Sequence, residues 1–65
     1  MQIPRIGSKW IHTKGTIYEV YDITNELSTN QVDYPIMISY KNINTNDRWS
    51  RPLSKWYSSM IEYKN

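Results

Sequence analysis

The sequence predicts a small all-β protein, with at most one short helix near the carboxyl end. Three observations lead to this fold class: the chain has only 65 residues, strand-forming residues cluster in four short runs, and polar turn-forming residues separate the runs. In so short a chain, such strands are expected to form a strongly curved antiparallel sheet or a partly open SH3-like barrel. We expect one domain over residues 1–65.

The first half of the chain predicts two strands after an amino-terminal arm, residues 1–8. Residues 9–12 are short and rich in strand formers, and a tight turn follows in which Gly15 is free to adopt positive φ. Residues 16–24 are β-branched and aromatic almost throughout, which favours a strand. The in–out alternation fails near Asp22, which should point inward although it is charged, so we predict a bulge or bend there.

A polar loop at residues 25–33 separates these strands from the next one. Residues 34–41 alternate apolar and polar side chains, which predicts a strand. Pro35 belongs at the start of this strand, where no backbone donor is required. Asn-rich turn residues then lead into a fourth strand at residues 48–51.

The chain is expected to leave the sheet at Pro52, which lacks a backbone N–H. This places the β-barrel at residues 9–53 and a carboxyl-terminal helical turn at residues 54–62. Ser54 is a suitable helix cap, and the apolar residues that follow it have near-helical spacing.

Three Trp and six Tyr, with no Phe and no Cys, provide the large side chains of the core. Because disulfides are excluded, a small core needs these rings, so we favour an interior position for Trp49 and Trp56. The alternative is an exposed aromatic platform for a base, a sugar or a peptide. Trp10, on an expected edge strand, is predicted to be the most exposed of the three.

Composition argues against several classes of function. A thiolate metal site is impossible without Cys, and His12 is the only His, so neither a metal nor a cofactor is expected. No apolar run approaches the roughly 18 residues of a membrane span. The net charge of +2 is too small to indicate nucleic-acid binding by itself. We expect a cytoplasmic protein that is not an enzyme, with His12 as a surface residue beside a turn.

The motif Lys14-Gly15-x-x-Tyr18-Glu19-Val20, followed by Trp49-x-Arg51-Pro52-Leu53-x-x-Trp56, resembles a family of small bacterial and bacteriophage proteins of uncharacterised activity. Their sequences read KGxxYxV and then WxRPLxx(F/W). The resemblance covers about residues 8–60. It implies a phage or prophage origin and a compact β fold. The loop at residues 25–33 is longer than in the bacterial members, so a shared partner surface is not implied there.

Two classes of function remain open. The first is a binding module that engages a host or phage protein through strand edges and an aromatic groove. The alternative is nucleic-acid binding, with a basic rim contacting phosphates and aromatic rings stacking on bases. A third possibility is self-assembly, so we expect a monomer or a weak homo-oligomer. The candidate binding residues are Trp10, Lys14, Lys41, Arg48, Trp49 and Arg51.

For Arg51, the alternative to ligand binding is a structural role, in which its guanidinium stacks on or pairs with a neighbouring side chain. The candidate neighbours are Trp49, Tyr40 and Glu19. We favour this structural role, and we take Lys14, Lys41 and Arg48 first as solvated charges.

Overall fold

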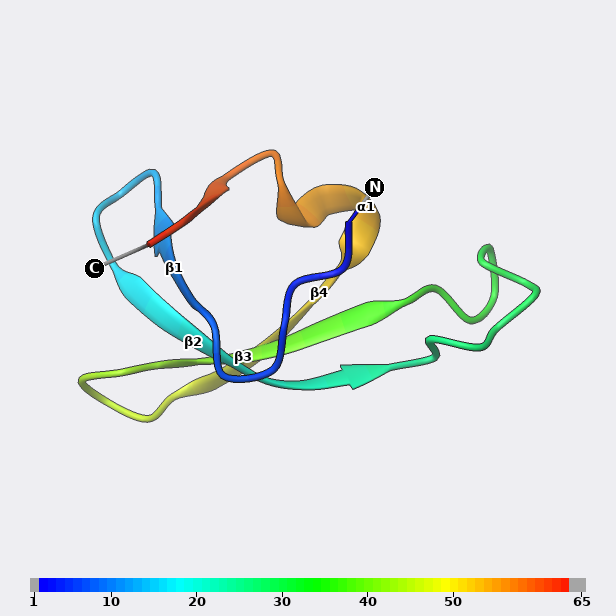
Figure 1. Ribbon diagram of the computed structural model, residues 1–65, viewed down its shortest axis with the longest axis horizontal. Helices are drawn as coiled ribbons and strands as arrows, with labels where there is room; N and C mark the ends of the chain where they lie inside the picture. Colours follow the sequence, from blue (N-terminus) through cyan, green and yellow to red (C-terminus); the bar gives the residue numbers. More distant parts are fainter. Residues whose placement is uncertain (1, 64–65) are drawn as a thin grey trace.

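The computed structural model describes residues 2–63 and contains five antiparallel strands and one short helix (Figure 1). The strands form one open sheet in the order β4-β3-β2-β1-β5, so β4 and β5 are its edges. This confirms the expected all-β class with a short helix. The sheet is open, however, and does not form the SH3-like barrel expected over residues 9–53, because β4 and β5 do not pair with each other. The elements are β1 (Lys9–His12), β2 (Ile17–Thr24), β3 (Met37–Asn42), β4 (Arg48–Pro52), α1 (Leu53–Trp56) and β5 (Met60–Glu62).

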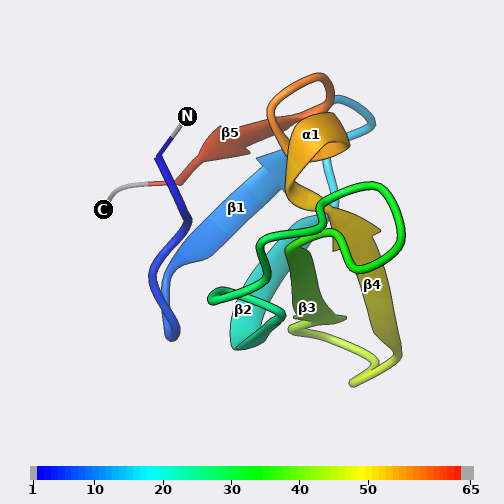
Figure 2. The same cartoon turned by 90° about the vertical axis from the view of Figure 1, so that its right-hand side faces the viewer.

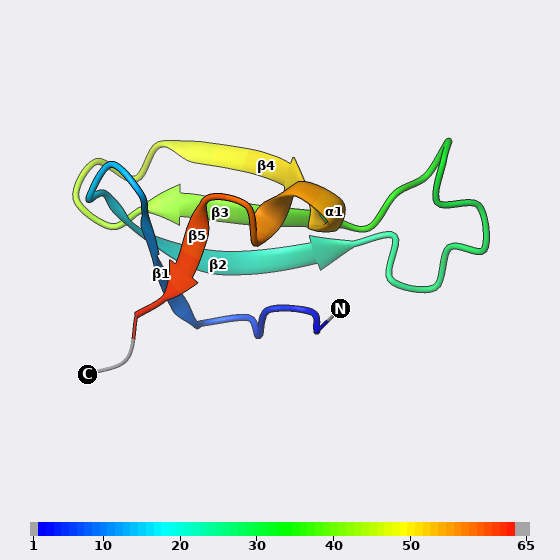
Figure 3. The same cartoon turned by 90° about the horizontal axis from the view of Figure 1, so that it is seen from above.

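The strands β2, β3 and β4 form a meander, and β1 and β5 lie at a steep angle to β3 (Figure 1). The β1–β2 and β3–β4 turns lie at one end of the molecule, and the loop between β2 and β3 projects from the other end (Figure 3). Gly15, in the β1–β2 turn, has a φ of +95°, as the sequence predicts.

A bulge interrupts the β2–β3 ladder between Val20 and Asp22. Val20 pairs with Tyr40 and Asp22 pairs with Ser39, so Tyr21 is the additional residue. The bulge lets β2 follow β1 at one end and β3 at the other, and it keeps the charged Asp22 exposed. The predicted irregularity near Asp22 is therefore confirmed.

One face of the sheet, which we call the inner face, is covered by α1 and carries the core (Figure 2). The opposite face is called the outer face. Edge-to-face contacts join Trp56 to Trp10 and to Tyr40, with ring centroids 5.5 and 5.1 Å apart. Trp56 is fully buried, as the sequence predicts. The buried core residues are Trp10, Val20, Ile38, Tyr40, Trp56 and Met60.

The carboxyl-terminal segment differs from the expected helical turn over residues 54–62. The helix α1 already ends at Trp56, and Met60–Glu62 is the strand β5, which pairs with β1. The expected cap at Ser54 is also wrong, because Pro52 occupies the N-cap position and no side chain caps the helix. In this segment, backbone pairing with β1 determines the conformation, although the apolar residues have near-helical spacing.

The predictions for two of the tryptophans are wrong. Trp10 is only 4% exposed, because β5 pairs along β1 and makes β1 an interior strand. Trp49 is 54% exposed, because its strand β4 is an edge and Trp56 fills the centre of the core. The sequence thus predicts an exposed Trp10 and a buried Trp49, whereas the structure shows the reverse.

Candidate functional site

The free edge of β4 is the main candidate surface. Asn42 N–H donates to the carbonyl of Asp47 at 2.9 Å, and Leu53 N–H donates to the carbonyl of Ile36 at 2.9 Å. These bonds fix the alternation of the β3–β4 ladder, in which every second residue bonds to the neighbouring strand. Trp49 and Arg51 therefore direct their backbone groups toward β3.

The intervening residues of β4 direct their backbone groups away from the sheet. These groups are the N–H and carbonyl of Arg48, the N–H and carbonyl of Ser50, and the carbonyl of Pro52. Pro52 has no N–H, and at this position the missing donor would face away from β3, so the ladder loses nothing. Figure 2 shows β4 at one margin of the sheet. Such an edge can accept another strand.

Trp49 provides an exposed aromatic surface on this edge. It pairs with the buried Tyr40 of β3, which places its indole on the inner face. Since no strand lies beyond β4, more than half of the Trp49 side chain remains in solvent. A large ring at a strand edge provides apolar contact area for a partner.

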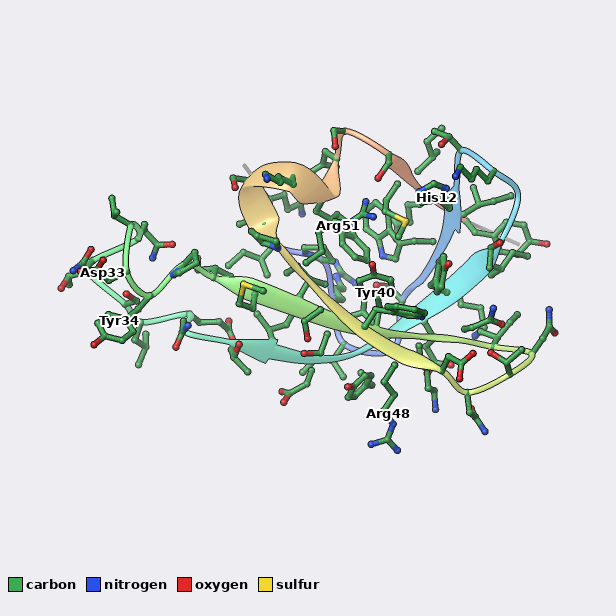
Figure 4. The ribbon with its side chains drawn as sticks, turned by 180° about the vertical axis from the view of Figure 1, so that it is seen from behind. His12, Asp33, Tyr34, Tyr40, Arg48 and Arg51 are labelled. Atoms are coloured by element: carbon green, nitrogen blue, oxygen red, sulfur yellow. The ribbon has the colours of Figure 1, made fainter. Side chains whose placement is uncertain are left out.

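The two arginines of β4 lie on opposite faces, as Figure 4 shows. Arg51 points to the inner face, where its guanidinium carbon lies 6.0 Å from the centre of the Tyr40 ring and Nη1 donates to Ser59 Oγ. Arg48 points to the outer face and lies 5.3 Å from the centre of the Tyr21 ring. Arg51 thus contacts Tyr40, which is one of the three neighbours expected for it.

The remaining expected site residues do not join one rim. Lys41 pairs with Arg48 and lies beside it on the outer face. Lys14 is in the exposed β1–β2 turn, at the same end of the molecule (Figure 3). The structure thus groups Lys14, Lys41 and Arg48 loosely at one end and places Arg51 on the other face. Trp10 is in the core, where its ring cannot stack on a base.

His12 lies at the end of β1 beside that turn, as expected. Its Nδ1 accepts the backbone N–H of Lys14 at 3.0 Å, so the ring helps to order the turn. Within residues 2–63, no three His, Cys, Asp or Glu side chains come together as ligands for a metal ion.

An apolar pocket of about 210 Å³ lies where β4 passes into α1, and the sequence gives no signal for it. Its walls come from residues on the β2–β3 loop and from the start of α1, namely Gln31, Pro35, Ile36, Leu53 and Ser54. The Leu53–Ile36 hydrogen bond holds the two walls together. The pocket therefore lies near the Pro52 end of β4, between the start of α1 and the segment that leads into β3.

A second pocket, of about 310 Å³, lies between the amino-terminal arm, β1 and β5. Tyr57 lines it, packs edge-to-face on Trp10 at 5.5 Å, and donates its hydroxyl to the Gln2 carbonyl at 2.5 Å. Burial raises the pKa of Tyr57, and the nearby Glu62 carboxylate raises it further. The sequence gives no signal for this pocket either, because it depends on the folding of the arm onto Tyr57.

Comparison with known protein families, with curated proteins and with solved structures finds no match to this chain. No helix within residues 2–63 has the length and apolar character needed to cross a membrane.

Proposed function

We propose that this chain is a non-enzymatic binding module that takes an extended segment of a partner protein as an added strand on β4. The observation that carries the proposal is the free edge of β4, which combines outward backbone groups at Arg48 and Ser50 with the exposed ring of Trp49. Strand addition uses such main-chain bonds for affinity and side-chain contacts for specificity.

The side chains of the edge define the chemistry of the segment. The strand β4 carries two arginines and no acidic residue, so an acidic segment complements it. A partner side chain on the inner face meets Trp49, and one that extends beyond Pro52 reaches the apolar pocket. We therefore propose an extended, acidic segment with one apolar anchor at the Pro52 end.

Nucleic-acid binding is less well supported by this geometry. Its predicted cations are divided between the two faces, and one of its stacking rings, Trp10, is buried. A phosphate backbone needs several cations along one track. The distribution of charge thus favours a protein partner.

The test begins with selection of peptides from a random display library on the immobilised chain. We expect acidic peptides with an apolar residue, and we expect Trp49→Ala to weaken their binding about tenfold or more. Leu27→Ala is the control, because Leu27 is 96% exposed on the β2–β3 loop and lines neither pocket. Both variants should retain the circular dichroism spectrum of the original chain.

Two results would contradict the proposal. One is selection of peptides whose affinity is the same for the Trp49→Ala variant as for the original chain. The other is tight binding of DNA or RNA oligonucleotides with affinity that falls steeply as salt increases, which would support the alternative function.

A further inference from the structure

We propose that the outer face of the sheet is a dimerisation surface that binds the same face of a second copy of this chain. This inference is independent of the proposed function, because it uses the opposite face and not the free edge of β4. It depends on two neighbouring rows of residues, one apolar and one charged, which we call the isoleucine row and the charged row.

The isoleucine row crosses four neighbouring chain segments at one level of the sheet. The ladders pair Ile61 with Ile11, and Ile11 with Ile17. Ile43, directly after β3, continues the row, because its N–H donates to the Ile17 carbonyl at 3.3 Å. Each isoleucine is the sequence neighbour of an inner-face residue, so all four lie on the outer face.

The isoleucine row is at least partly open to solvent along its whole length. Ile61 is 65% exposed, Ile43 is 39% exposed, and Ile11 and Ile17 are half-buried. The residues packed against the core do not include any of the four. A contiguous apolar row that is partly exposed marks a candidate interaction surface.

The charged row lies beside the isoleucine row. Lys9 pairs with Glu19, and Glu19 pairs with Lys41. Tyr63 extends the row past Lys9, because its N–H donates to the Lys9 carbonyl at 2.9 Å. From β5 to β3, the charged row therefore consists of an aromatic, a positive, a negative and a positive side chain, namely Tyr63, Lys9, Glu19 and Lys41. Arg48 follows on β4.

A two-fold axis parallel to the strands, between β1 and β2, makes these rows self-complementary. It places Ile11 opposite Ile17 of the second copy, and Ile61 opposite its Ile43. It also places Lys9 opposite Glu19 of the second copy, while Lys41 faces the Tyr63 ring. Since the contact is isologous, each pair occurs twice, and no like charges meet. This charge pattern identifies a second copy as the occupant.

The contact has the geometry of an aligned sandwich, in which sheets lie about 10 Å apart. Four segments at about 4.8 Å spacing span only about 15 Å, well short of a standard interface of about 800 Å² per partner. The steep angle between β1 and β3 reduces the contact further (Figure 1). The dimer is consequently weak and forms at high protein concentration.

Sedimentation equilibrium over a range of protein concentrations tests the surface. The original chain should show a monomer–dimer equilibrium, and Ile61→Lys should weaken it by about tenfold or more. Val32→Lys adds the same charge to an exposed loop residue and should leave the equilibrium unchanged. An original chain that stays monomeric at every concentration, or an Ile61→Lys variant that dimerises normally, would overturn the proposal.

A charge exchange tests the two-fold geometry. Lys9→Glu and Glu19→Lys should each abolish self-association, because each places like charges across the axis. An equal mixture of the two variants should form a heterodimer, since the two carboxylates of one variant then face the two ammonium groups of the other. A mixture that fails to associate, while the original chain dimerises, would rule out the arrangement.

Two further measurements distinguish this face from the other surfaces. Lys55→Glu and Glu26→Lys make the same charge changes off the outer face and should dimerise like the original chain. Trp49→Ala should also dimerise normally, and a loss of dimer in this variant would move the contact to the β4 edge and overturn the proposal. Concentration-dependent methyl shifts confined to Ile11, Ile17, Ile43 and Ile61 would support it.

Discussion

Trp56 organises the core of this protein, because its buried ring contacts both Trp10 and Tyr40 edge-to-face. Among the described residues, its indole N–H has no hydrogen-bond partner. Its contribution is therefore packing rather than hydrogen bonding. Trp49, by contrast, pairs with Tyr40 at the sheet edge and remains largely in solvent.

These positions predict very different effects of truncation on stability. Trp56→Ala should lower the free energy of unfolding by about 3–5 kcal/mol, which rivals the whole stability of so short a chain. Trp56→Phe is a milder variant that should lose less, since the indole N–H has no bond to break. Trp49→Ala should cost less than about 1 kcal/mol. Urea unfolding measures all three, and a larger loss for Trp49→Ala than for Trp56→Ala would contradict this core.

Tyr57 makes the stability depend on alkaline pH. The folded chain holds the phenol proton more tightly than the unfolded chain, because burial and then Glu62 raise its pKa. The stabilisation is complete below the pKa of unfolded tyrosine, about 10, and is lost as pH rises through the folded pKa. The lost proton also removes the donor to Gln2.

A ¹³C NMR titration of the Tyr57 ring measures this effect. Glu62→Gln should lower the pKa of Tyr57 while leaving it above about 10, since burial is the larger cause. Glu26→Gln, in the β2–β3 loop, is the control. A pKa at or below 10 in the original chain, or one that Glu62→Gln does not change, would contradict this account.

Among the elements, β2 and its bulge follow from local sequence, whereas β5 does not. The β-branched run and the misplaced Asp22 predict both the strand and its irregularity. Met60–Glu62 has only three residues, and its strand conformation comes from pairing with β1, far away in the chain. Local apolar spacing cannot reveal such a partner, so it predicts a helix instead.

The sequence does not reveal that β5 pairs with β1, and this also explains the wrong predictions for the tryptophans and for part of the candidate site. Without β5, β1 becomes an edge, and Trp10 is then expected in solvent. Three of the six expected binding residues, Arg48, Trp49 and Arg51, do lie on the edge strand β4. Their sequence places them on one strand, but only the sheet order reveals that this strand is an edge.

Among substitutions, those at Ser50 test strand addition on β4 most directly. Its N–H points away from β3, so Ser50→Pro removes a donor for an added strand without breaking the β3–β4 ladder. Peptide affinity should fall about tenfold or more. Ser50→Ala is the control, because it keeps the N–H and loses only the 3.2 Å contact with the Ser39 hydroxyl. Affinities measured by titration calorimetry should therefore separate the two variants, and equal losses would contradict strand addition.

At the scale of the whole molecule, the chain has two candidate surfaces that do not overlap. The free edge of β4 is proposed for an extended partner segment, and the isoleucine and charged rows are proposed for a second copy. With the two-fold axis between β1 and β2, the β4 edge lies outside the contact between copies. The dimer would therefore present two free edges, which favours a partner with two binding segments.

Amide hydrogen exchange at β4, with and without a selected peptide, tests the central claim most directly. In the free chain, the amides of Trp49 and Arg51 should exchange slowly, and those of Arg48 and Ser50 should exchange rapidly. Bound peptide should slow exchange at Arg48 and Ser50. Exchange at these two amides that stays rapid with saturating peptide would contradict strand addition on β4.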